Sequence, residues 1–432
     1  MKRIIIILSL ALPLVAFGQQ KEPLTIEQSI STALKNNYGI IIRNKNLEIS
    51  QTNNSWGAVG ALPSLSLSGN ASNTSNYNDT DDFTTQNYSG TVSLNWVLFR
   101  GLGAHIDKAK LEEMENLSQG NLAVVVENTI SNVILSYYNV LLQDENTKMM
   151  EKLMSLSKDR YDSEKLKTEI GSSVTYDLLQ AQNSYLEDKS NYLSASASYN
   201  NAVRQLNYLM AEPLDKSYHF LTTFTADTSS FEKQVLMDHL MSNNNTLKNQ
   251  YINLELTKLN VRSARSSFSP TVTAGASGGY SDSETKYDTN SLMNYSSSGF
   301  NTTFSLGVSF SLFDGGTKRQ ALKVAKLEED IAEVEIEEMT ADLENQLSQE
   351  YELYQVRKEM LTLANENLEA AELNLKISQQ KFDTGAINSF NFRDVQQIYL
   401  SAALSQHNAI YNVIQSYHSL LRLTGGLIGE YQ

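Results

Sequence analysis

Residues 91–101 read Thr-Val-Ser-Leu-Asn-Trp-Val-Leu-Phe-Arg-Gly, and no proline follows them before Pro213. Apolar side chains occupy every second position, at Val92, Leu94, Trp96 and Leu98. A period of two predicts a β-strand with two different faces. The segment from Gly101 to Tyr161 predicts a helix of roughly 60 residues, about 90 Å long at 1.5 Å per residue. The sequence therefore predicts a strand that runs directly into a very long helix.

The same arrangement occurs a second time in the chain. Leu-Phe-Arg-Gly at 98–101 recurs as Leu-Phe-Asp-Gly at 312–315, an offset of 214 residues, and Gly171 recurs as Gly385 at the same offset. Pro63 recurs as Pro270 at an offset of 207, which places the difference of about seven residues in a strand hairpin, where insertions are tolerated best. Each copy predicts a helix, two strands, a long helix, a turn and a returning helix.

The duplication gives the predicted domain boundaries. The first repeat covers residues 19–211 with its strand hairpin at 62–100, a linker covers 212–230, the second repeat covers 231–426 with its hairpin at 269–314, and a tail covers 427–432. Residues 1–18 have a basic start, an apolar run and small residues before Gln19, the layout of a cleaved signal peptide. An uncleaved anchor is the alternative, but the apolar run is shorter than the roughly 20 residues that a spanning helix needs.

Composition excludes several classes of protein. The chain has 34 basic and 49 acidic side chains, a net charge of −15 and no basic stripe that could neutralise phosphates, so nucleic acid is not an expected partner. It has no cysteine, which excludes disulfides, thiolate metal sites and a cysteine nucleophile. Only five prolines occur, and this scarcity permits long uninterrupted helices.

The four predicted strands each have one apolar face and one face of small polar residues. Leu94 and Leu306 lie on the apolar face, and Ser93 and Ser305 lie on the polar face. A half-buried soluble sheet would alternate in the same way. Lengths near the roughly 9 to 11 residues that cross a bilayer, and a polar face with few charges, favour a membrane β-barrel. Four strands cannot close a barrel, since about eight are needed, so we predict a barrel shared between copies.

The strand hairpins and helices show no catalytic pattern in a fitting context. Residues 275–279 match the hydrolase pattern G-x-S-x-G, but they lie inside an alternating strand and not at a strand-to-helix turn. The five histidines lie far apart in sequence without ligand spacing. Apolar residues at three- and four-residue steps, such as Ile130, Val133 and Tyr137, predict coiled-coil packing. We therefore expect no metal, no cofactor and no enzymatic activity.

The order of elements, the duplication and the turn residues together resemble the TolC-type outer-membrane efflux protein family over nearly the whole chain after residue 18. The matching segments are Leu24–Asn36, Leu62–Pro63, Phe99–Gly101, Gly171–Gln182, Ser269–Pro270 and Phe313–Gly315. The resemblance implies a mixed α and β membrane protein. It would be a homotrimer whose twelve-stranded transmembrane β-barrel, four strands per chain, continues as a long α-helical coiled-coil tunnel. The barrel would lie in the outer membrane of a Gram-negative bacterium, with a large part of the chain in the periplasm.

The resemblance also implies the function and the partners. The chain would be an outer-membrane channel subunit that provides the exit duct for efflux or type I secretion. It would work with a periplasmic adaptor (membrane-fusion) protein and an inner-membrane RND or ABC pump, and its barrel would contact outer-membrane lipid. The alternative is a coiled-coil surface or filament protein without a channel, which would not need two alternating strand hairpins.

The resemblance places the functional residues at the periplasmic end of the tunnel. The adaptor-facing turns would contain Gly171, Ser173, Thr175, Gly385, Asn388 and Ser389, and the aperture would contain Asp177, Asn391 and Asp394. Phe382 and Ile387 stand where some members have a tyrosine and an arginine that lock the aperture, so that lock is not expected here. Asp177 also fits a simpler role near a helix start, where the helix dipole favours an acid, and Asp394 is therefore the stronger pore candidate.

Overall fold

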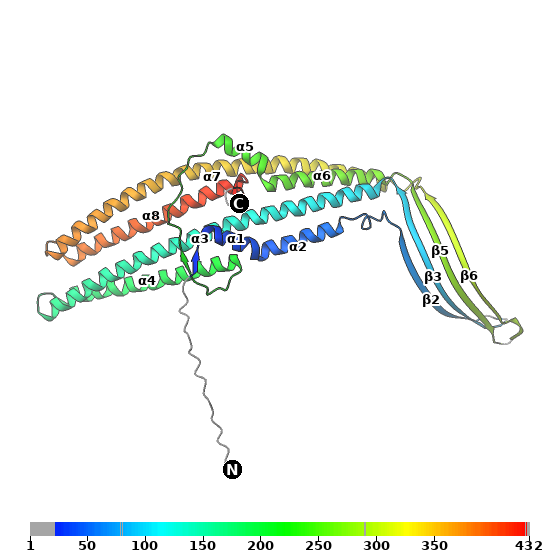
Figure 1. Ribbon diagram of the computed structural model, residues 1–432, viewed down its shortest axis with the longest axis horizontal. Helices are drawn as coiled ribbons and strands as arrows, with labels where there is room; N and C mark the ends of the chain where they lie inside the picture. The colour runs from blue at the N-terminus through cyan, green and yellow to red at the C-terminus, as the bar shows by residue number, and fades with distance from the viewer. Residues whose placement is uncertain (1–21, 78, 80, 289–290, 428, 430–432) are drawn as a thin grey trace, which may run out of the picture.

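The computed structural model describes residues 22–77, 79, 81–288, 291–427 and 429. The predicted signal peptide and all of the predicted tail except residues 427 and 429 lie outside the described residues. The molecule is elongated, with long helices at one end and a curved sheet at the other (Figure 1). Among the described residues, the helices include none with the length and apolar character needed to cross a membrane.

Both repeats contain the predicted order of helix, two strands, long helix and returning helix, but the opening helix is divided in two. The first contains α1 (Ile26–Asn36), α2 (Tyr38–Asn53), β2 (Ser64–Asn76), β3 (Phe83–Arg100), α3 (Gly103–Glu169) and α4 (Thr175–Met210). The second contains α5 (Lys233–Asn243), α6 (Asn245–Ser266), β5 (Thr271–Tyr287), β6 (Tyr295–Ser309), α7 (Thr317–Asp383) and α8 (Ser389–Leu423), with a single 3₁₀ turn, η1 (Ser291–Met293), between its strands. Two short parallel strands, β1 (Glu22–Leu24) and β4 (Tyr218–Phe220), were not predicted.

The four long strands form one antiparallel sheet in the order β2-β3-β5-β6. Its register places Leu65 opposite Leu94, Leu94 opposite Ala276, and Ala276 opposite Phe304. Up to Trp96, the alternate apolar residues of the four strands therefore share one face, as predicted from the period of two. A register shift between Val97 and Phe99 then places Phe99, and not the predicted Leu98, opposite Val272. The strands β2 and β6 form the two edges, and each has one side that pairs with no other described strand.

The strands are longer than predicted. They extend well into residues 73–87 and 281–298, whose content of asparagine, serine, threonine and aspartate predicts solvent-exposed loops: β3 begins at Phe83 and β5 ends at Tyr287. The prediction was wrong there because asparagine, serine and threonine were taken as a loop signal, whereas backbone groups can pair across strands whatever the polarity of the side chains. The two strand pairs cover residues 64–100 and 271–309.

The helix that was expected to open each repeat is divided in two at an asparagine. Asn37 ends α1 and begins α2, and its side chain accepts hydrogen bonds from the backbone N–H groups of Gly39 and Ile40. Asn244 does the same between α5 and α6, where its side chain accepts from the Leu247 N–H. An asparagine at this position satisfies the free N–H groups of the new helix, so the chain changes direction without losing hydrogen bonds.

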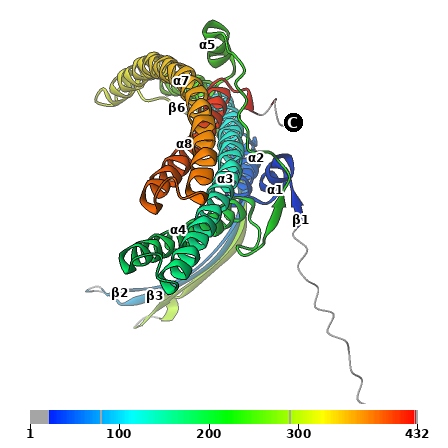
Figure 2. The same ribbon diagram turned by 90° about the vertical axis from the view of Figure 1, so that its left-hand side faces the viewer.

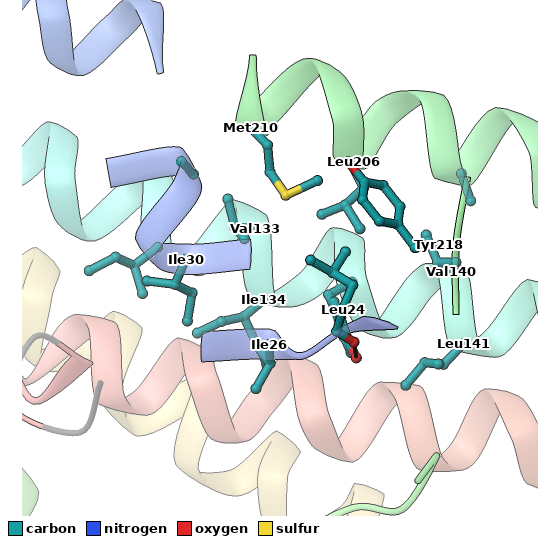
Figure 3. Packing of buried hydrophobic residues seen from close by; sticks show 14 of the residues in the cluster. Leu24, Ile26, Ile30, Val133, Ile134, Val140, Leu141, Leu206, Met210 and Tyr218 are labelled. Carbon is teal, nitrogen blue, oxygen red and sulfur yellow. Dashed lines mark hydrogen bonds between the residues drawn. The ribbon is translucent and has the colours of Figure 1, made fainter. Parts of the chain in front are cut away.

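Two buried clusters lie near the middle of the long helices. One buried cluster joins α1, β1, α3, α4 and β4, and in it Leu24, Ile134 and Leu206 pack together (Figure 3). A second cluster joins α5, α6, α7 and α8. The buried hydroxyls of Tyr137 and Tyr354 donate hydrogen bonds to the backbone of Leu24 and Ser229, at 3.0 and 2.7 Å. Residues 212–230, the predicted linker, therefore pack against the outside of the long helices.

Candidate functional site

The turns α3–α4 and α7–α8 lie at the end of the molecule farthest from the sheet (Figure 1). We call this region the tip: residues 170–174 and 384–388 together with the helix ends that flank them. An end-on view shows the α3–α4 and α7–α8 hairpins side by side, and α8 contacts both α7 and α3 (Figure 2). A cavity of about 540 Å³ opens between the two hairpins and is lined by residues from both repeats.

The two turns have the same geometry in both repeats. Gly171 and Gly385 have φ angles of +74° and +75°, the left-handed region that favours glycine. The next residue in each turn donates its N–H back into the helix, from Ser172 to the Lys167 carbonyl and from Ala386 to the Lys381 carbonyl, both at 2.8 Å. This pattern ends a helix by satisfying its last carbonyl groups. The glycines are therefore the residues at which each long helix stops.

The tip brings part of the predicted site together. Five of the predicted residues line the cavity: Ser173, Asp177, Gly385, Asn388 and Ser389. The other four, Gly171, Thr175, Asn391 and Asp394, do not belong to its lining. Asp177 is half-buried in the first turn of α4, whereas Asp394 is exposed and lies beyond the first turn of α8. The helix-dipole explanation therefore fits Asp177 better than Asp394.

A buried ion pair next to the tip was missed by the sequence analysis. Arg393 on α8 donates two hydrogen bonds to Asp188 on α4, at 2.6 and 2.7 Å, one to each carboxylate oxygen. Asp188 is only 1% exposed. Two parallel bonds between a guanidinium and a carboxylate give a strong and directional contact. This pair joins the second repeat to the first.

Two further charged residues are buried beside this pair. Arg160 on α3 donates to the Ser389 carbonyl at 3.3 Å. Burial, followed by repulsion from Arg393, lowers the pKa of Arg160 to about 10, so it stays protonated at neutral pH. Glu164 accepts hydrogen bonds from the side chains of Ser173, at 2.9 Å, and Lys167, at 2.8 Å. Arg160 follows Leu153 by seven residues and Glu164 follows Arg160 by four, so Arg160 and Glu164 lie on the buried face of α3. This helical spacing is the sequence signal that could have identified the cluster.

Phe382 and Ile387 make no polar lock. The Phe382 ring on α7 stacks on Phe392, with centroids 4.9 Å apart, and the Lys167 ammonium of α3 lies 5.4 Å from its centroid. Ile387 lines the tip cavity. At the tip the contacts between the repeats include Arg393 with Asp188, Arg160 with Ser389, and Lys167 with Phe382.

The histidines and the hydrolase-like pattern lie where they can pack or pair but do not form a catalytic or metal-binding arrangement with the other described residues. Within the described ranges, no group of three or more histidine, cysteine, aspartate or glutamate side chains could hold a metal ion. His407 shares a hydrogen bond of 2.8 Å with the Asn146 side chain, and burial lowers its pKa. The hydrolase-like pattern at 275–279 lies inside β5, so it does not form the strand-to-helix turn that such a nucleophile needs.

Comparisons with known proteins agree with this architecture. The family model for the outer membrane efflux protein matches residues 29–212 and again residues 236–426, one match for each repeat. A search of the curated proteins returns no match.

Solved structures share the fold. The chain is similar to CusC, with 18% identity, a TM-score of 0.76 and coverage of 93% of this chain and 92% of that one. It is similar to the Campylobacter jejuni CmeC outer membrane channel, with 16% identity, a TM-score of 0.75 and coverage of 93% and 85%. It is also similar to the open state of the Neisseria gonorrhoeae MtrE outer membrane channel, with 16% identity, a TM-score of 0.72 and coverage of 93% and 89%.

The two family-model matches cover nearly the same residues as the two structural repeats. Sequence and architecture therefore indicate the same family over most of the chain. The chain belongs to the outer membrane efflux protein family, a family of transport channels and not of enzymes.

Proposed function

We propose that this chain is one subunit of a homotrimeric exit duct for efflux or type I secretion. The observation that carries the proposal is a four-stranded sheet with one apolar face and two open edges, joined to helices of 67 residues each. Three copies would give twelve strands, enough to close a barrel around a lumen lined by serine and threonine. The helices would continue this lumen as a tunnel.

The exposed apolar face of the sheet supports a membrane setting for the barrel. Leu306 on the apolar face of the sheet is 72% exposed in the single chain, which suits contact with lipid. The barrel would lie in the outer membrane of a Gram-negative bacterium, and the helices would extend about 100 Å into the periplasm at 1.5 Å per residue. The tip would meet a periplasmic adaptor protein through the turns of both hairpins, and through it an RND or ABC pump. Asp177, Asn391 and Asp394 would face the aperture.

Cell fractionation and gel mobility test this proposal directly. The chain should be found in the outer-membrane fraction and should run as a trimer in detergent without heating and as a monomer after boiling. A coiled-coil surface or filament protein would not show both a heat-modifiable trimer and membrane integration. Recovery of the chain in soluble fractions would reject the channel.

The apolar face can be tested by charge. Replacing Leu94 or Leu306 with arginine should impair insertion, because arginine on the lipid face near the bilayer midplane costs about 2 to 4 kcal/mol. Replacing Ser93 or Ser305 with arginine should be milder, because these positions lie on the opposite face. The measurement is the amount of heat-modifiable trimer in the outer membrane. Equal assembly of the four variants would show that the faces are assigned wrongly.

The aperture can be tested by ion selectivity. Three copies of Asp394 around a narrow opening would concentrate cations, because like charges in a confined space are poorly screened. Asp394→Asn should therefore reduce cation preference and block by multivalent cations in planar bilayers. Asp177→Asn, in the first turn of α4, is the matched comparison and should have the smaller effect. Unchanged selectivity in the Asp394 variant would place this carboxylate outside the pore.

A further inference from the structure

The chain leaves two flanks open. The edge strands β2 and β6 have 13 and 15 residues, and neither contains a charged residue or a proline. The helices pack in the same order as the strands, with α2 against α3, α3 against α6, and α6 against α7. The outer helices carry exposed apolar side chains: Ile42 on α2 is 58% exposed, and Val334 on α7 is 61% exposed. We call β2 with α2 the first flank and β6 with α7 the last flank.

Open flanks of this kind call for a partner. A long, uncharged strand edge presents unpaired N–H and C=O groups that would pair with another strand, and proteins normally protect such edges with charges, prolines or a cover. A two-fold contact of β2 with β2 would leave β6 uncovered. A contact between the last flank of one copy and the first flank of the next covers both and closes a ring. The partner is therefore a second copy of this chain.

The duplication is regular enough to predict how the copies meet. Within the first repeat Ser64 pairs with Asn95, and at the same place in the second repeat Thr271 pairs with Ser309. The far ends agree as well, since Asn76 pairs with Phe83 and Ser283 pairs with Ser297. Each residue of β2 thus corresponds to the residue of β5 that is 207 positions later in the sequence. Each partner residue of β3 corresponds to the residue of β6 that is 214 positions later, over the whole length of β2.

The pairing of β3 with β5, which connects the two repeats, then serves as a template for the pairing between two copies of the chain. In that pairing Thr91 lies opposite Gly279 and Asn95 lies opposite Gly275. We propose that β6 of one copy pairs antiparallel with β2 of the next in the equivalent register, with Ser305 opposite Ser72 and Ser309 opposite Ser68. This inference rests on the proposed channel and adds which residues of neighbouring subunits face each other.

The pattern of side chains agrees with this register. It places Leu306 opposite Ala71 and Val308 opposite Gly69, so apolar positions meet apolar positions while serines meet serines. A slip of one residue would place the apolar residues of one strand beside the serines of the other, because successive side chains point to opposite faces. This alternation excludes slips of an odd number of residues, and the offsets taken from the pairing within the repeats then select the register.

The helices lead to the same contact. In the template, Gly120 on α3 lies directly against the Asn249 side chain on α6, and Asn249 also donates to Asn121 at 3.1 Å. The equivalents of Gly120 and Asn249 at the last and first flanks are Val334 and Ile42. Their exposed apolar side chains would be buried against each other in the ring, which removes both from water. The contact between copies is therefore apolar where the contact within the chain is polar.

Cysteine cross-linking tests the register, because the natural chain contains no cysteine. The full-length variant pairs Ser68→Cys with Ser309→Cys, and Ser72→Cys with Ser305→Cys, should form covalent dimers and trimers in membranes after oxidation or treatment with a short bis-maleimide. The exchanged pairs, Ser68→Cys with Ser305→Cys and Ser72→Cys with Ser309→Cys, use the same substitutions. They are four residues out of register, roughly 13 Å along a strand, beyond the reach of a disulfide. The matched pairs should give about tenfold more product than the exchanged ones.

The outcomes separate this inference from the channel itself. Within one chain β2 and β6 are three strand spacings apart, about 14 Å, so a cross-link between them joins two copies. Product from the exchanged pairs, or no product from any pair in a chain that still runs as an unheated trimer, would overturn the register and leave the channel standing. A chain that runs as a monomer before boiling would reject both. Cross-linking of Ile42→Cys with Val334→Cys is expected as a second sign of the same contact.

Discussion

Replacing Arg393 with leucine is expected to lower the free energy needed to open the tip by about 3 to 5 kcal/mol. The reason is that the substitution leaves the buried carboxylate of Asp188 without the guanidinium that bonds both of its oxygens. Asp188→Leu should have a similar effect, since it removes both short hydrogen bonds and leaves Arg393 with the more distant, exposed carboxylate of Glu187 at 3.7 Å. Proteolysis of an opened segment follows the population of the open form, so cleavage at the turns of the purified trimer should become about 100-fold faster or more.

The double variant separates the cost of an unpaired charge from the value of the pair. Arg393→Leu combined with Asp188→Leu should restore much of the resistance to proteolysis, because an apolar pair of similar volume often replaces a buried ion pair at little cost. Arg204→Leu is the control, because Arg204 and Asp215 form an exposed pair at 3.5 Å and such pairs contribute about 0 to 1 kcal/mol. A double variant as sensitive as either single variant would show that the pair does not hold the hairpins together.

Replacing Gly171 and Gly385 together with valine should abolish export while leaving a heat-modifiable trimer. Apart from the adjoining residues of the turn, no atom of the described chain lies within 4 Å of an added Cβ at either position, so the effect would come from the backbone. Left-handed φ values cost an ordinary residue about 1 to 2 kcal/mol, and a β-branched residue resists them most. The last turn of each long helix would then lose its geometry. Export is measured by restored resistance in cells that lack their own channel.

The matched control keeps valine in the same turns. Ser172→Val with Ala386→Val places the side chain one residue later, where φ is not positive, and should retain export. Gly171→Asn with Gly385→Asn should retain more export than the valine pair, because asparagine enters the left-handed region more readily. Normal export by the double valine variant would show that the geometry of these turns is not needed for the proposed contact with the adaptor.

The sequence predicted the features that depend on local pattern. The repeat of Leu98–Gly101 at Leu312–Gly315 and the alternation around Leu94 located the duplication, the strands and the shared apolar face. The glycines predicted where α3 and α7 stop because only their backbone favours a positive φ. These signals lie within a few residues of the feature that they specify.

The features that the sequence did not predict depend on distant partners or on ambiguous residues. Arg393 and Asp188 are 205 residues apart, and nothing near either residue indicates the other. Asn37 divides the opening helix through a side-chain cap, yet asparagine is equally common in turns. The polar ends of β3 and β5 were taken for loops because their pairing depends on the neighbouring strand.

The equal lengths of α3 and α7 restrict how this gene can change. Both helices have 67 residues, which keeps the two turns of the tip level with each other. Deleting one heptad from α3 alone would preserve its seam but raise its turn by about 10 Å relative to the other. Lineages that lengthen or shorten the duct should therefore carry insertions and deletions in both repeats together, as correlated pairs, while the strand hairpins vary in length independently, as the seven additional residues of the second hairpin already do.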